Sequence, residues 1–153
     1  MKVKLIISHF LITAIIITLI SVNDFSEKGY LATFFFSLFL YLLSGYIATN
    51  TNKIMLFDTF IIAIIGTIIW LLCYISSPND FNYKGHNGGS WFFYQLYIMV
   101  NSPLNFVDNI SNYFNTSKAI RLTSDLIFPF IFSLFQCCGA IIKQRILKMI
   151  THK

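Results

Sequence analysis

Charged residues are scarce in this sequence and make up only 11% of its 153 residues, whereas soluble domains carry roughly 25%. Hydrophobic residues make up 56%, and the mean hydropathy is +0.70. A water-soluble domain of this size has too little core volume to hide so much apolar surface. The composition therefore excludes an ordinary soluble protein.

The usual signatures of catalysis and metal binding are also missing. There is no Walker A loop, no GxGxxG and no HExxH, and the histidines and cysteines lack metal-ligand spacing. Three cysteines fall within apolar runs and form no CxxC pair, so no disulfide framework is indicated: Cys73, Cys137 and Cys138. We expect no enzyme activity, no cofactor and no metal. An intramembrane enzyme would require Ser44 to lie within hydrogen-bond reach of His9.

The net charge of +5 and the pI near 9.2 do not indicate nucleic-acid binding. Such binding needs a basic stripe with interleaved aromatic residues on a soluble face, and the sequence has none. Cytoplasmic loops of membrane proteins collect lysine and arginine, which accounts for the positive charge. We therefore expect no nucleic-acid partner.

Four apolar runs are long enough to cross a bilayer, because a membrane-spanning helix needs about 20 residues at 1.5 Å each. They predict an all-α, polytopic transmembrane helical bundle with 1–153 as a single integral membrane domain. The four spans are expected at about 5–22, 30–48, 54–75 and 120–142. The first run also resembles a signal peptide, but its length and the lack of a small-residue cleavage site favour a retained span.

The distribution of cations predicts that both termini are cytoplasmic. Seven cations would face the cytoplasm and four the other side, where acidic residues dilute them. The cytoplasmic group is Lys2, Lys4, Lys53, Lys143, Arg145, Lys148 and Lys153. Residues 143–153 form a basic tail, which we expect to lie against anionic lipid headgroups.

Residues 77–119 form a long extracytoplasmic loop between the last two spans. Within it, about 91–100 is rich in aromatic residues and too short to span, which predicts an interfacial or re-entrant helix. A fifth crossing over 91–106 is the alternative. It would place the basic tail outside, against the charge bias.

Polar residues inside the apolar runs are the candidate functional residues, because an ionisable group in hydrocarbon is costly. His9 and Asp58 lie at matching depth near the cytoplasmic surface, and Gln136 lies at similar depth in the last span. Together they would form an intramembrane polar cluster suited to a proton or cation relay. The alternative is that each simply bonds to a neighbour or reaches headgroup water.

The sequence thus favours a small membrane protein with an accessory, regulatory or protective role. It would bind the lipid bilayer and another membrane protein or a second copy of itself, with Trp91, Tyr94 and Tyr97 as a partner surface. The competing function is a small transporter or pore subunit. The abundance of isoleucine, lysine and asparagine favours a bacterial origin, and hence the bacterial cytoplasmic membrane.

Overall fold

The computed structural model of the protein describes residues 1–22, 27–50, 56–76, 94, 97–98 and 118–151. Within these ranges every regular element is an α-helix, which confirms the all-α prediction for the described part of the chain. The helices are α1 (Lys2–Val22), α2 (Glu27–Ala48), α3 (Leu56–Thr59), α4 (Ile61–Ser76) and α7 (Lys118–Thr151).

Three of these helices, α1, α2 and α7, are long and apolar enough to cross a membrane. Their outward faces are apolar as well: on α1, the side chains of Val3, Ile7 and Phe10 are each more than half exposed. These residues recur at the helical period and form one face. Lipid is the environment that suits an exposed apolar face of this extent, so the protein is membrane-embedded.

The third predicted span differs from expectation, because 54–75 does not form one continuous helix. A turn at Phe60 separates α3 from α4, and α4 has only 16 residues. The amide N–H of Ala63, three residues after this turn, donates to the Ser133 Oγ of α7 at 3.0 Å. A side chain from another helix therefore satisfies the backbone group that the break leaves free, as an apolar environment demands.

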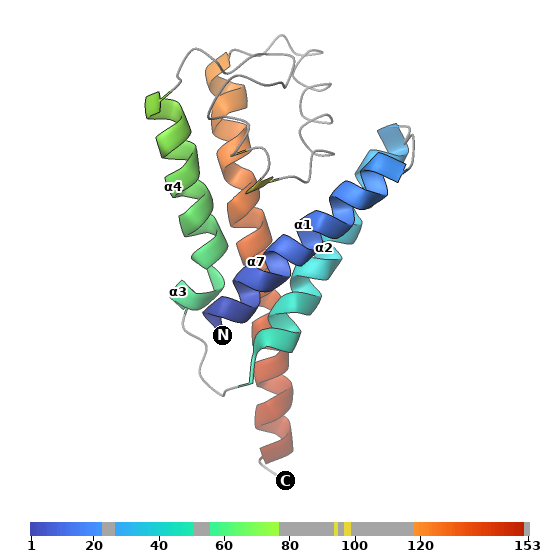
Figure 1. Ribbon diagram of the computed structural model, residues 1–153. Coiled ribbons are helices and arrows are strands. Elements are labelled where there is room, and N and C mark those ends of the chain that lie inside the picture. The colour runs from blue at the N-terminus through green and yellow to red at the C-terminus, as the bar shows by residue number, and fades with distance from the viewer. Residues whose placement is uncertain (23–26, 51–55, 77–93, 95–96, 99–117, 152–153) are drawn as a thin grey trace.

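The helices pack as two leaning pairs (Figure 1), in which α1 lies beside α2 and α4 beside α7. α4 and α7 are antiparallel: a Cβ on Gly66 would meet Pro129, and one turn earlier Ala63 bonds to Ser133. The start of α1, the end of α2 and α3 lie at one end of the bundle, and α7 runs past them to the C-terminus.

The two pairs are held together where α2 crosses α7. A Cβ on Gly45 would overlap the backbone carbonyl of Gln136, and a Cβ on Gly139 would overlap that of Leu42. Two glycines therefore bring the helix backbones into direct contact, a common way for helices to associate in lipid.

α7 is 34 residues long, about 51 Å at 1.5 Å per residue. A hydrocarbon core is only about 30 Å thick, so the helix extends well beyond it at one end. The basic segment after residue 142 continues this helix as far as Thr151. Over these residues, the predicted tail is an extension of the last span.

Three described residues between α4 and α7 lie inside the bundle. Tyr94, Tyr97 and Ile98 are all buried in the core, and the Tyr97 hydroxyl donates to the Ile62 carbonyl at 2.8 Å. Ile62 lies about 21 Å along α4 from Ser76, where the chain leaves that helix. Tyr97 therefore lies well away from the Ser76 end of α4. The alternative of a fifth crossing over 91–106 falls almost wholly outside the described residues.

Candidate functional site

His9 is the centre of a buried hydrogen-bond network that joins four parts of the chain. Its side chain is 1% exposed. Nδ1 lies 2.8 Å from the Tyr41 hydroxyl of α2, and Nε2 lies 3.1 Å from the backbone carbonyl of Tyr97. Tyr97 in turn bonds to Ile62 of α4. We call His9, Tyr41 and Tyr97 the His9 network.

The geometry determines which ring nitrogen of His9 carries the proton. A carbonyl oxygen only accepts, so Nε2–H donates to Tyr97. In the neutral ring, Nδ1 then accepts from the Tyr41 hydroxyl. Both nitrogens are therefore occupied by protein groups, and neither is left to bind a substrate.

Ring stacking fixes the position of the network. Tyr41 stacks on Phe132 of α7 with ring centroids 4.5 Å apart and an interplanar angle of 11°. The rings of His9 and Tyr97 lie 4.6 Å apart. Such contacts add about 0.5–1.5 kcal/mol each beyond their buried area. The network is thus held rigidly between α1, α2 and α7.

Gln136, which is fully buried, belongs to a separate chain of hydrogen bonds. Its Nε2 donates to Ser44 Oγ at 3.0 Å, and the Ser44 hydroxyl donates to the Tyr41 carbonyl at 2.8 Å. The reverse amide orientation would need the Ser44 proton that Tyr41 already receives, so the network fixes the amide. Oε1 of Gln136 is buried and accepts no hydrogen bond from the residues that the structure describes.

Asp58 forms an ion pair with Lys2 of α1, with Nζ and Oδ1 3.3 Å apart. The side chain of Asp58 is 17% exposed and that of Lys2 is 57% exposed. An ion pair so open to solvent contributes at most about 1 kcal/mol. It connects α1 to α3 at one end of the bundle.

The structure therefore gives each member of the predicted polar cluster different partners. His9 bonds to two tyrosines, Asp58 pairs with Lys2, and Gln136 bonds to Ser44. The interaction expected between His9 and Asp58 is absent from the described contacts. Ser44 bonds to Tyr41 and Gln136, and no hydrogen bond joins it to His9 among the described contacts.

Two of the three residues of the predicted partner surface are described by the structure. Trp91 lies outside the described residues, while Tyr94 is 1% exposed and Tyr97 is 7% exposed. These two tyrosines pack inside the bundle, because the segment that carries them is held by His9 and Ile62.

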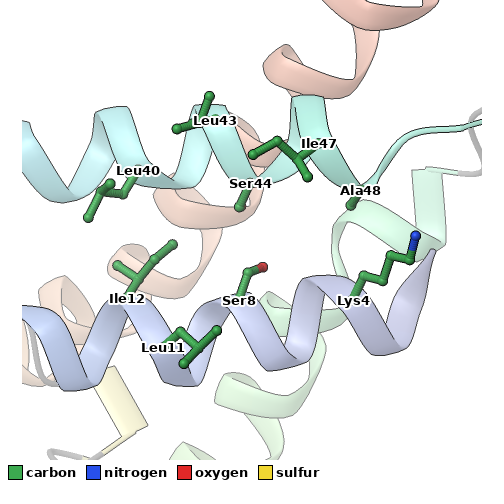
Figure 2. A pocket seen from close by; sticks show the side chains of 9 residues that line it. All are labelled: Lys4, Ser8, Leu11, Ile12, Leu40, Leu43, Ser44, Ile47 and Ala48. Atoms are coloured by element: carbon green, nitrogen blue, oxygen red, sulfur yellow. The ribbon is translucent and has the colours of Figure 1, made fainter.

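A groove of about 200 Å³ runs between α1 and α2 and is open on one side (Figure 2). Figure 2 shows Ser8 and Ser44 facing each other across its middle, with Lys4 and Ala48 at one end. The remaining lining residues are apolar: Leu11, Ile12, Leu40, Leu43 and Ile47. Its location gives it access to the surrounding lipid.

Among the described residues, no three histidine, cysteine or acidic side chains come together where they could hold a metal ion. Comparison of the chain with models of protein families, with curated proteins and with solved structures finds no match. The site must therefore be interpreted from its own geometry.

Proposed function

We propose that this protein is a non-catalytic, multi-pass membrane protein with an accessory, regulatory or protective role, and that it acts by binding lipid or another membrane protein. Its setting is the bacterial cytoplasmic membrane, with both termini in the cytoplasm. The observation that carries this proposal is the His9 network, in which both ring nitrogens are bonded to protein groups across helices. Buried polar groups used in this way hold a bundle together.

The proposal includes a fourth crossing made by α3 and α4 together. Residues 56–76 measure about 31 Å if they run in line, which matches the hydrocarbon thickness. The bend at Phe60 shortens this length, and the Lys2–Asp58 ion pair beside it suits the membrane boundary. Because four is an even number of crossings, both chain ends would lie on the same side of the membrane.

A small transporter or pore subunit is the second candidate function. The observation that favours it is that Gln136 Oε1 is buried and accepts no hydrogen bond within the described part of the chain, while Asp58 carries a carboxylate whose Oδ1 lies 3.3 Å from the Lys2 ammonium. Such atoms are the kind that a permeating cation or water would contact.

Flux measurements on the full chain in sealed lipid vesicles distinguish the two functions. The accessory role predicts that proton and cation flux equals that of protein-free vesicles, for the wild type and for Asp58→Asn alike. Lys2→Gln is the matched control, because it breaks the same ion pair but keeps the carboxylate. Flux that Asp58→Asn abolishes and Lys2→Gln preserves would establish permeation and overturn the proposal.

Photocrosslinking in the native membrane tests the binding role directly. A photoreactive residue is placed at Phe39 on α2 or at Leu72 on α4, both of which are 58% exposed. The proposal predicts a discrete adduct, with one protein or one lipid class, at some positions and not at others. The same mixture of bulk lipid adducts at every position would count against it.

A further inference from the structure

We propose that the groove between α1 and α2 binds one acyl chain of an anionic phospholipid, with the lipid phosphate beside Lys4. This proposal rests on the proposed function and names the ligand class of one site. The occupant is a lipid because the groove opens sideways between two membrane-length helices. Its shape, lining and single cation each support this assignment.

The groove is apolar even where serine residues line it. The Ser8 hydroxyl donates to the Leu5 carbonyl of its own helix at 2.9 Å, and the Ser44 hydroxyl donates to the Tyr41 carbonyl. Ser44 Oγ also accepts from Gln136. These bonds use both serine protons, so neither hydroxyl is left with an unpaired donor. A hydrocarbon chain can therefore cover both serines without burying an unpaired donor.

The volume of the groove suits part of one chain. A water molecule occupies about 30 Å³ in the liquid, and a methylene group is of similar size, so about 200 Å³ holds roughly seven methylenes. This is enough for the upper part of an acyl chain, the part nearest the headgroup.

The cation at the end of the groove determines the headgroup. Lys4 is exposed, and no carboxylate of the described residues lies within ion-pair distance of it. Lys2 already pairs with Asp58, so Lys4 is the cation at the groove that remains available to an anion. It lies in the first turn of α1, at the depth where lysines meet lipid phosphates. Charge complementarity therefore favours an anionic phospholipid over a neutral one.

A second copy of the chain fits this surface less well. Asp58 is the acidic side chain whose exposure the structure describes, and Lys2 already neutralises it. Among the residues whose exposure is described, a second copy thus offers Lys4 no unpaired carboxylate.

The test is retention of added lipid by the purified full chain in detergent, measured by native mass spectrometry. Phosphatidylglycerol and phosphatidylcholine of equal chain length are the two probes. The wild type is expected to bind phosphatidylglycerol more tightly. Lys4→Gln should weaken its binding about fivefold and remove the preference, and Lys4→Arg should restore it. Arg145→Gln is the charge control, because Arg145 is exposed but does not line the groove.

Filling the groove tests the acyl-chain part of the proposal. Leu43→Trp should reduce retention of both lipids, whereas Leu72→Trp, which adds the same side chain to an exposed site on α4, should not. Equal retention by Leu43→Trp and the wild type would overturn the proposal. A wild-type dimer that Leu43→Trp dissociates, with no retained lipid, would also overturn it.

The outcomes also distinguish failure of the lipid site from failure of the proposed accessory role. Loss of the lipid site leaves the accessory role standing if photocrosslinking still yields a discrete adduct. Flux that depends on Asp58 overturns the accessory role whatever the groove binds. A thermal unfolding midpoint for each variant confirms that the folded chain is being compared.

Discussion

The hydroxyl of Tyr41 shows how polar side chains are accommodated within this bundle. It lies in the middle of an apolar helix, is fully buried, and lies 2.8 Å from His9 Nδ1. Because Nε2 must keep its proton to bond to the Tyr97 carbonyl, the ring cannot change tautomer to compensate for a lost partner. The Tyr41 hydroxyl is therefore specifically required at this position.

Tyr41→Phe is expected to destabilise the folded chain. Removing the hydroxyl leaves His9 Nδ1 buried without a donor, and interhelical hydrogen bonds in membrane proteins contribute about 0.6 kcal/mol on average, with a maximum near 1.7 kcal/mol. Thermal unfolding in detergent measures the change. Tyr74→Phe is the matched control, because Tyr74 is 47% exposed. Equal midpoints for the two variants would contradict the network described here.

The sequence could reveal His9 as a residue of interest but not its partners. A histidine in an apolar run can be recognised from the sequence. Its partners cannot, because Tyr41 and Tyr97 are 32 and 88 residues away along the chain. The approach of His9 to Asp58 was predicted from depth alone. Depth does not specify which face of a helix a residue occupies, and Lys2 is the residue that meets Asp58.

At the scale of helices, the contact between α2 and α7 depends on two glycines. A Gly→Ala change inside an ordinary helix stabilises it by about 1 kcal/mol. At Gly139 the added Cβ overlaps the backbone of Leu42, so α2 and α7 must separate. We expect Gly139→Ala to destabilise the protein by about 1–3 kcal/mol instead. The sign of the change in unfolding free energy decides the matter, and a gain in stability would show that the two backbones do not touch.

The break between α3 and α4 gives a second prediction at this scale. Ser133→Ala removes the acceptor of the Ala63 N–H and should cost about 0.5–1.5 kcal/mol. Hydrogen exchange should then accelerate at the Ala63 amide in particular. Ser76→Ala is the control, since the Ser76 side chain is exposed and its hydroxyl donates to the Leu72 carbonyl of its own helix. Unchanged exchange at Ala63 in Ser133→Ala would mean that α3 and α4 form one regular helix.

Hydropathy predicted the helices well because burial in lipid acts on every residue of a span. It located α1, α2 and the apolar part of α7 within a few residues. It did not predict the break at Phe60, because no glycine or proline occurs between Leu56 and Ile61. That break depends on Ser133, and such a tertiary contact has no local signature. The continuation of α7 to Thr151 was missed because polarity ends the apolar run without ending the helix.

At the scale of the whole molecule, the protein is a helical bundle within lipid, and buried polar side chains such as His9, Tyr41 and Gln136 bond across its helices. Its architecture follows from apolar runs and short turns, which the sequence shows directly. The course of the chain between α4 and α7 does not, because aromatic residues suit both a membrane interface and a buried contact. Only the bonds of Tyr97 to His9 and Ile62 distinguish these locations.

The most direct test of this account is the accessibility of single cysteines to a membrane-impermeant thiol reagent. The native cysteines, Cys73, Cys137 and Cys138, are first replaced, and one cysteine is then introduced at Lys4, Ser76 or Arg145 in oriented membrane vesicles. The account predicts labelling of positions 4 and 145 from the cytoplasmic side and of position 76 from the opposite side. Labelling of positions 4 and 145 from opposite sides, or of 4 and 76 from the same side, would contradict it.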